Sequence, residues 1–310
     1  MGHERLAHPT FLVIGAMRGG TTTLYQVLRT HPSVFMASVK ETNFFAFSEG
    51  QSDLPLDPQA QATLFANSIT SADKYVALFQ GSGSAKATGE VSPSYLYSPG
   101  AAARISDSLP DAKIVALLRD PVERAYSAYL RRSGVPTGPE SFITTAETEH
   151  RKVLGGERLP HYPLIVGSMY AGHLDRFLSV IPRSQLWVGI FEDFWSNPDA
   201  GFAELQSFLD IEPFQHGIPQ LNKSGVPRFR PLDKLLRGGA RAKSLIKSRL
   251  PARAVRSLVN FKQRIEDWSM SRPEILPAGI RTHLLESYFD EDIQKTERML
   301  GRDLALWRRP

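Results

Sequence analysis

Five short runs, each the length of a buried strand, recur along the chain, and four of them are continuously apolar. They lie at residues 11–14, 34–37, 87–91, 114–118 and 186–191. Longer segments with apolar residues at helical spacing lie between and after them, and these cover residues 21–28, 58–66, 71–79, 142–154, 168–178, 199–209 and 284–307. Strands that alternate with helices in this order predict an α/β fold with a central parallel sheet flanked by helices.

The sharpest break in this pattern comes at residues 15–20, where the first apolar run gives way to glycines and then to a helix that begins with three threonines. Backbone N–H groups of such a loop and of a helix N-terminus point at one spot, and the helix dipole favours an anion there. Gly15 and Gly20 have the spacing of a nucleotide-triphosphate P-loop, but Thr21 stands where that loop carries lysine, and a cation lies inside the loop at Arg18. The sequence therefore predicts an anion site without the main charge-neutralising side chain of an ATPase or kinase.

A second strand-to-helix junction follows the apolar run at 114–118. Arg119 stands at the carboxyl end of this strand, and Asp120-Pro121 supplies a helix N-cap followed by proline in the first turn. Ser127 follows on a neighbouring face of the predicted helix. Alone, this junction also fits an ordinary helix start, but the planar, permanently charged guanidinium of Arg119 and the small hydroxyl of Ser127 suit a phosphate.

Together the two junctions resemble those of the sulfotransferases that use 3′-phosphoadenosine 5′-phosphosulfate (PAPS) as sulfuryl donor. In that family a basic residue precedes GGTT or SGTT in the 5′-phosphosulfate loop, and the arginine and serine of R-D-P-x-x-R-x-x-S contact the 3′-phosphate. The resemblance implies a P-loop-like sulfotransferase fold, PAPS as cosubstrate, and no metal. The donor contacts that it implies are Arg18, Gly19, Gly20, Thr21, Thr22, Thr23, Arg119 and Ser127.

Residues 40–45, K-E-T-N-F-F, combine a cation, a carboxylate and two aromatic residues just past the second strand. In an open α/β sheet ligands bind outside the carboxyl ends of the strands, so this segment and the 15–20 loop should face the same crevice. K-E-x-x-F-F is similar to the glycan-type sulfotransferases, in which the glutamate takes the proton from the acceptor hydroxyl. The resemblance makes Glu41 the candidate base for an in-line attack on sulfur, with Arg18 and Lys40 as the catalytic cations. A surface Lys–Glu pair beside two core phenylalanines is the alternative.

The segment after the third strand resembles the family's E-K-T-P-x-Y, with one departure. Glu90 stands in the glutamate position, but Val91 takes the place of the lysine. If that lysine polarises the transferred sulfate, the chain must do without its charge or obtain it from Lys40. Glu90 is a secondary candidate that binds the acceptor or orients a basic residue.

Composition adds limits of its own. With 310 residues, 42% of them hydrophobic, the chain is long enough for a large core, and we expect a single domain over residues 1–310. The absence of cysteine excludes disulfides and cysteine metal sites. Residues 1–10 lack the apolar region of a signal peptide, and no apolar run reaches the roughly 20 residues needed to span a bilayer. We therefore expect a cytoplasmic protein rather than a membrane-anchored Golgi-type enzyme.

The net charge of +5 is spread unevenly. Between Lys223 and Arg264 there are thirteen basic residues against Asp233 alone, so this segment carries +12 and the remainder of the chain −7. Apolar residues recur among the cations, which indicates helices with one apolar and one basic face. A solvated surface, a surface for an anionic glycan acceptor and peripheral attachment to acidic lipid all fit. Lys223 and Arg228 are additional candidate donor contacts by family resemblance.

Other functions are weaker alternatives. Nucleic acid is disfavoured because no aromatic interleaving accompanies the basic charge. A non-catalytic nucleotide- or membrane-binding protein on the same fold is the main alternative, and a P-loop kinase or NTPase is a more distant one. His31 is predicted to be a helix-end residue rather than a catalytic one, and His161 and His173, which lack a metal-ligand pattern, are predicted not to bind a metal. The sequence leaves the acceptor open among carbohydrate, lipid and small metabolite.

Overall fold

A computed structural model describes residues 8–48, 51–132, 138–214, 226–227, 270–271 and 274–309. Lys223, Arg228 and all of the basic segment 223–264 except residues 226–227 lie outside the described residues. Those two residues form β8 (Val226–Pro227), which pairs antiparallel with β9 (Met270–Ser271).

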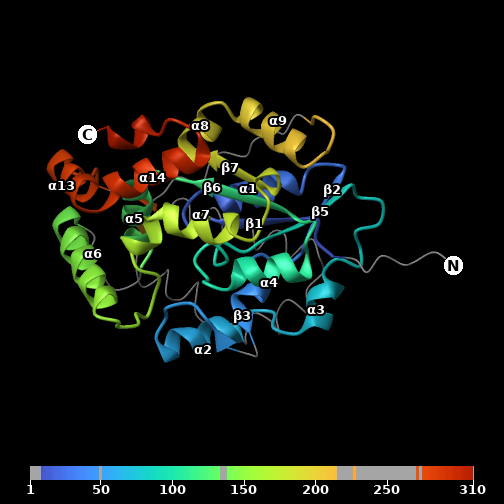
Figure 1. Ribbon diagram of the computed structural model, residues 1–310, viewed down its shortest axis with the longest axis horizontal. Helices are drawn as coiled ribbons and strands as arrows, with labels where there is room; N and C mark the ends of the chain where they lie inside the picture. Colours follow the sequence, from blue (N-terminus) through green and yellow to red (C-terminus); the bar gives the residue numbers. More distant parts are fainter. Residues whose placement is uncertain are drawn as a thin grey trace.

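The centre of the fold is a five-stranded parallel sheet in the order β2-β5-β1-β6-β7 (Figure 1). Its strands are β1 (Phe11–Gly15), β2 (Val34–Met36), β5 (Ala87–Val91), β6 (Lys113–Leu118) and β7 (Leu186–Ile190). All five strands were predicted, four of them from continuous apolar runs, and β1, β5 and β7 are buried along their whole length. Such runs are typical of a parallel sheet covered on both faces.

Helices cover both faces of this sheet. The helices among the described residues are α1 (Thr21–Leu28), α2 (Pro58–Ala66), α3 (Ala72–Ala77), α4 (Ala101–Ser108), α5 (Pro121–Leu130), α6 (Pro139–Leu154), α7 (Tyr170–Leu178), α8 (Phe191–Ser196), α9 (Pro198–Phe208), α13 (Ala278–Leu284) and α14 (Asp290–Leu300). A short antiparallel pair, β3 (Phe47–Ser48) with β4 (Gln51–Ser52), lies apart from the main sheet.

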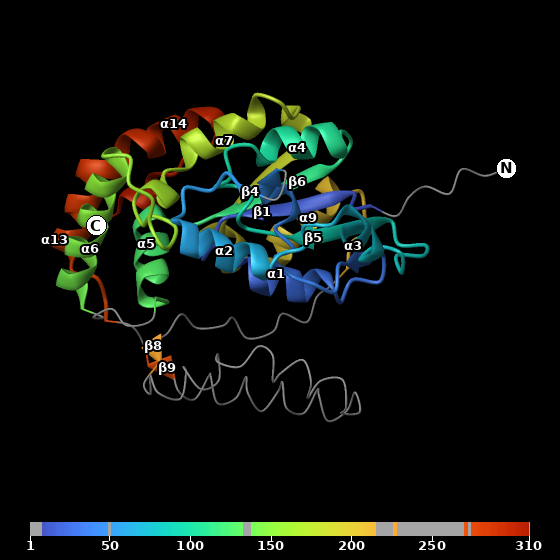
Figure 2. The ribbon, with the colours of Figure 1, turned by 90° about the horizontal axis from the view of Figure 1, so that it is seen from below.

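The alternation of side chains along β1 divides the apolar core into two clusters. Leu12 and Ile14 pack with residues of α4 and α7, whereas Phe11 and Val13 pack with residues of α1 and α9. Figure 2 shows α4 and α7 on one side of the sheet and α1 on the other. The predicted α/β architecture, with helices on both sides of a parallel sheet, is confirmed.

Two local predictions were wrong. The helix predicted at 284–307 begins earlier, at Ala278, contains a π-helical turn at Leu285–Phe289 and ends at Leu300, because Gly301 has φ 62° and caps the helix. The strand predicted to reach Phe191 ends at Ile190, and neither α4 nor α8 was predicted. The six-residue helix α8 stops at Asn197, whose side chain accepts a hydrogen bond from Ala200 N and so caps the next helix.

No helix among the described residues is both long and apolar enough to cross a membrane.

The C-terminal helix α14 is attached to helix α7 through a side-chain cap. Asp292 on α14 accepts hydrogen bonds from the backbone N–H groups of Tyr170 and Ala171, at 2.7 and 3.2 Å, and so caps the first turn of α7 from another part of the chain. Burial nevertheless raises the pKa of Asp292 to about 6. The folded state therefore holds a proton on this carboxyl at a pH where the unfolded chain has lost it.

Replacement of Asp292 by asparagine tests this assignment. Because the pKa of Asp292 is raised on folding, its contribution to stability is fully present below pH 4 and is lost as pH rises through about 6. Asp292→Asn keeps an acceptor oxygen but cannot ionise. Between pH 4 and pH 7 the free energy of unfolding of this variant should therefore fall less than that of the wild type, and the difference should be on the order of 2 kcal/mol. Urea denaturation at both pH values measures this difference. An unchanged pH dependence contradicts the assignment.

Candidate active site

The glycines of the loop between β1 and α1 allow neighbouring residues to approach its backbone closely. A Cβ atom at Gly19 would lie 2.3 Å from the Leu117 carbonyl oxygen, and one at Gly20 would lie 2.9 Å from the indole nitrogen of Trp195. Gly20 also has φ 82° at the N-cap of α1, where glycine is favoured. No acidic residue lies in the first turn of α1, so its N-terminal N–H groups remain suited to an anion.

The three threonines that follow point in different directions. The side chains of Thr21 and Thr23 are buried, whereas Thr22 is exposed. The hydroxyl-bearing first turn predicted from the sequence therefore has two members facing the protein and one facing solvent.

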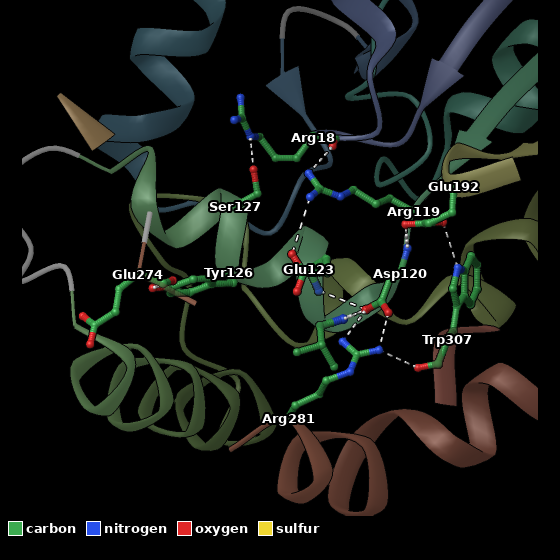
Figure 3. Close-up of polar contacts among 11 residues, drawn as sticks. Arg18, Arg119, Asp120, Glu123, Tyr126, Ser127, Glu192, Glu274, Arg281 and Trp307 are labelled. Carbon is green, nitrogen blue, oxygen red and sulfur yellow. Dashed lines mark hydrogen bonds and ion pairs between the residues drawn. The ribbon is translucent and has the colours of Figure 1, made fainter. Parts of the chain in front are cut away.

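Arg18 joins the two motifs that the sequence placed 100 residues apart. Its Nε donates a hydrogen bond to Ser127 Oγ at 3.0 Å, from the β1–α1 loop to helix α5 (Figure 3). Within the described ranges Arg18 forms no ion pair with a carboxylate. Burial and the neighbouring charges of Arg131, Arg119 and Arg124 lower the pKa of Arg18 to about 10. A protonated arginine held among like charges is the electrostatic environment of an anion site.

Arg119 lies at the end of β6, the strand beside β1. Its guanidinium donates to the Arg18 carbonyl oxygen at 3.4 Å, lies 3.6 Å from Glu123 Oε2, and is 4.9 Å from the centre of the Phe191 ring. Its Nε atom is buried without a hydrogen-bond partner. A buried donor without a partner is unfavourable unless a ligand supplies the acceptor, so Arg119 fits an anionic ligand.

The N-terminus of α5, which carries Arg119, is fixed from the far end of the chain. Asp120 accepts hydrogen bonds from Val122 N and Glu123 N, and its Oδ2 lies 2.5 Å from Arg281 Nη2 (Figure 3). Arg281 also donates to the Trp307 carbonyl oxygen at 2.9 Å. Thus α13 and the final turn hold the strand-to-helix junction in place.

A second carboxylate completes this attachment. Glu192 on α8 accepts a hydrogen bond from Asp120 N at 3.0 Å through one oxygen and from Trp307 Nε1 at 3.1 Å through the other. Trp307 is completely buried, and burial raises the pKa of Glu192. The acidic groups around Arg119 therefore bond mainly to backbone and to C-terminal residues.

Arg124, one turn beyond Asp120, is structural. Its Nε donates to Ser168 Oγ at 2.6 Å and its Nη2 to the Leu164 carbonyl oxygen at 2.7 Å, and the side chain is 1% exposed. These contacts hold helix α5 against the segment around Ser168.

The predicted base lies at the neighbouring strand ends. The ammonium of Lys40 pairs with the Glu41 carboxylate, whose side chain is 56% exposed, and Glu41 N donates to the Val91 carbonyl oxygen at 2.8 Å. Glu41 has φ 65°, in the left-handed region. The structure therefore brings Lys40 and Glu41 together beside the carboxyl end of β5, where the Glu41 side chain is open to solvent.

Glu90 does not lie where the sequence suggested. It is completely buried, and its carboxylate accepts hydrogen bonds from hydroxyl groups instead of facing an acceptor or a basic side chain. Val91 is also buried, in the apolar cluster on the α1 side of the sheet. Since successive strand residues point to opposite faces, neither side chain faces the open end of β5.

Comparison with known proteins identifies the family. A family model described as "Sulfotransferase family" matches residues 9–216, about two thirds of the chain. The chain belongs to the sulfotransferase family. The crystal structure of a sulfotransferase from Alicyclobacillus acidocaldarius, 26% identical, superposes with a TM-score of 0.68 over 98% of this chain and 100% of that chain.

Two relatives indicate the range of this family. Heparan sulfate glucosamine 3-O-sulfotransferase 6 of Homo sapiens is 29% identical, over 84% of this chain and 70% of its own length. A membrane-associated sulfotransferase of Dictyostelium discoideum is 25% identical over 68% of this chain, and the match spans 58% of that protein.

Several aromatic residues of this sulfotransferase border the site and were not predicted. Tyr97 accepts a hydrogen bond from Met17 N in the glycine loop at 3.1 Å, and its ring lies 5.3 Å from that of Tyr162. The Tyr162 hydroxyl and the Trp195 indole N–H are buried without a partner. Aromatic residues in apolar segments give no sequence signal that separates a site wall from ordinary core.

The histidines of the sulfotransferase have structural contacts. His31 Nε2 lies 2.9 Å from the Glu212 carbonyl oxygen, His161 Nε2 lies 2.5 Å from Glu149 Oε1, and His173 Nε2 lies 3.0 Å from the Val166 carbonyl oxygen. In the part of the chain that the structure describes, no group of three or more His, Asp and Glu side chains is arranged to hold a metal ion.

Removal of the Arg281 side chain should destabilise the sulfotransferase. Asp120 is 7% exposed, so Arg281→Ala leaves a buried carboxylate without its ionic partner and should lower the free energy of unfolding by about 3 kcal/mol. The control is Arg302→Ala, which breaks the pair with Asp193, whose members are 38% and 50% exposed, and should change stability by less than about 1 kcal/mol. Urea denaturation compares the variants, and equal losses contradict the assigned role of Arg281.

Proposed function

We propose that this sulfotransferase transfers a sulfuryl group from PAPS to a hydroxyl group of an acceptor. The observation that carries the proposal is the Arg18–Ser127 hydrogen bond, because it joins the glycine loop to the R-D-P-x-x-R-x-x-S helix in one basic site. The lowered pKa of Arg18 and the buried, unpaired Nε of Arg119 both favour an anionic ligand with more than one charged group.

The residues divide between the two ends of the donor. Arg18, Gly19, Gly20 and the N-terminal turn of α1, with Thr21, Thr22 and Thr23, would hold the 5′-phosphosulfate, and Arg119 and Ser127 the 3′-phosphate. When bound, PAPS supplies the sulfuryl group and leaves as adenosine 3′,5′-bisphosphate. Lys223 and Arg228 stay predictions for additional donor contacts.

Glu41 would take the proton of the acceptor hydroxyl. The acceptor oxygen forms its bond to sulfur as the bond between sulfur and the bridging phosphate oxygen breaks, and the proton passes to the Glu41 carboxylate. Lys40, paired with that carboxylate, and Arg18 would balance the negative charge on the transferred oxygens. A carboxylate at the open end of the sheet is accessible to an alcohol without opening the fold.

A glycan hydroxyl is the acceptor class that we favour among carbohydrate, lipid and small metabolite. The human relative is named for action on heparan sulfate, and the 56% exposure of Glu41 leaves room for an extended acceptor. A cytoplasmic location, a single domain over residues 1–310, and glycan or acidic-lipid binding by residues 223–264 stay predictions.

Arg119→Ala should weaken donor binding. Loss of a charge-assisted contact to phosphate should raise the dissociation constant of adenosine 3′,5′-bisphosphate by about 10- to 100-fold. Isothermal titration calorimetry measures this constant. The control is Arg104→Ala, which removes a guanidinium that bonds Asp53 and the Phe45 carbonyl oxygen away from the loop. Donor affinity that is equal in wild type and Arg119→Ala is evidence against the assigned site.

Glu41→Gln should abolish turnover while leaving donor affinity intact. The amide cannot accept the acceptor proton, so we expect kcat to fall by about 10²- to 10⁴-fold. Transfer of radioactive sulfate from PAPS to a panel of glycans, lipids and small alcohols measures turnover, and calorimetry with adenosine 3′,5′-bisphosphate checks the donor site. Normal turnover in this variant means that Glu41 is not the base, whereas donor binding by the wild type without transfer to any acceptor favours a non-catalytic protein.

A further inference from the structure

Glu90 is a buried carboxylate surrounded by hydroxyl groups. Its Oε2 accepts hydrogen bonds from Thr42 Oγ1 at 2.7 Å and Ser92 Oγ at 2.8 Å. Its Oε1 accepts from the hydroxyls of Tyr95 at 2.6 Å and Tyr75 at 3.0 Å. These partners come from the 41–45 segment, from the turn after β5 and from α3, so one side chain connects three parts of the fold.

The same hydroxyl groups hold the segment that carries Glu41. Ser92 Oγ accepts a hydrogen bond from Asn43 N at 3.1 Å, and the Tyr95 hydroxyl accepts from Phe45 N at 3.4 Å. Thr42, which bonds Glu90 directly, is the next residue after Glu41. The backbone of this segment is therefore attached to Glu90 through hydroxyls on both sides of Asn43.

This segment needs outside support because two of its residues have left-handed backbones. Glu41 has φ 65° and Asn43 has φ 53°, a region that side chains other than glycine adopt uncommonly. Asn43 is further held by Ser94 Oγ, which donates to its side-chain oxygen at 2.6 Å, and its own amide donates to the Glu41 carbonyl oxygen at 3.0 Å. Such conformations persist where the surrounding contacts fix them.

An ionised carboxylate is well suited to organise these hydroxyls. A hydroxyl has one proton to donate, and when that proton goes to Glu90 the oxygen lone pairs are free for the backbone N–H groups. The carboxylate only accepts, so it fixes the direction of all four hydroxyls at once. Burial raises the pKa of Glu90, and the four hydroxyl donors oppose this rise.

We propose that Glu90 is a positioning residue for catalysis: through Thr42, Ser92 and Tyr95 it fixes the 41–45 backbone and so aims the Glu41 carboxylate at the acceptor hydroxyl. This rests on the proposed function, in which Glu41 takes the acceptor proton. It replaces the acceptor contact that the sequence suggested for Glu90. Small displacements of a catalytic group reduce turnover strongly without changing the affinity for a ligand bound elsewhere.

A matched pair of variants tests the proposal. Thr42→Val and Tyr75→Phe each remove one hydroxyl from Glu90 and keep most of the side-chain shape, but Thr42 adjoins Glu41, whereas Tyr75 lies on α3 and keeps its ring stacked on Phe44 at 4.2 Å. We expect kcat to fall by at least about tenfold in Thr42→Val and by less than about threefold in Tyr75→Phe. The dissociation constant of adenosine 3′,5′-bisphosphate should stay unchanged in both, which also verifies folding. Thr42→Ser, which keeps the hydroxyl, should restore kcat.

Glu90→Gln provides an independent measurement. The amide nitrogen cannot accept, so the hydroxyls on that side must reverse, and kcat should fall at least about tenfold at unchanged donor affinity. An equal fall in kcat in Thr42→Val and Tyr75→Phe, or a wild-type kcat in Glu90→Gln, overturns the positioning role. If Glu41→Gln is inactive at the same time, the proposed function still stands. Full turnover in Glu41→Gln refutes both the assigned base and this inference.

Discussion

Two arginines of like charge lie side by side at the ends of neighbouring strands, and much of the surrounding structure keeps them there. Arg18 follows β1 and Arg119 follows β6, and a hydrogen bond from the Arg119 guanidinium to the Arg18 backbone joins them. Burial, and after it repulsion from Arg131 and Arg119, opposes a charged Arg18 and lowers its pKa. The sheet and the closely packed glycines fix the backbone at both positions, and hydrogen bonds to Ser127 Oγ and to the Arg18 carbonyl oxygen hold the two side chains.

The acidic residues around this site are arranged so that they hold its scaffold more than they neutralise its charge. Asp120 bonds the first turn of α5 and Arg281, and Glu192 bonds Asp120 N and Trp307. Among the described residues, Glu123 is the one carboxylate that forms an ion pair with the Arg119 guanidinium, at 3.6 Å, and its side chain is partly exposed. The positive charge of Arg18 and Arg119 is therefore left largely for a ligand, and the C-terminal residues contribute to the site through this scaffold.

The parts of the fold and site that follow from local sequence were predictable. Four apolar runs located strands of the sheet, Gly15 to Gly20 located the loop between β1 and α1, and Asp120-Pro121 located the start of α5, because each depends on neighbouring residues. The contact of Arg281 with Asp120, that of Trp307 with Glu192 and the Arg18–Ser127 bond join residues more than 100 positions apart, and no spacing in one sequence encodes them. The burial of Glu90 was missed because a charged residue in a strand suggests an exposed site until its hydroxyl partners are known.

The valine in the family's lysine position can be understood from the same geometry. Val91 points into the apolar cluster beneath the sheet, where a charged side chain would have to leave the core to act. The hydrogen bond from Glu41 N to the Val91 carbonyl oxygen, at 2.8 Å, places the 40–41 peptide directly beside this position. The Lys40 ammonium group therefore belongs to the segment next to Val91, and it pairs with the Glu41 carboxylate. In the proposed function, Lys40 supplies at this end of the sheet the positive charge that the family's lysine would carry.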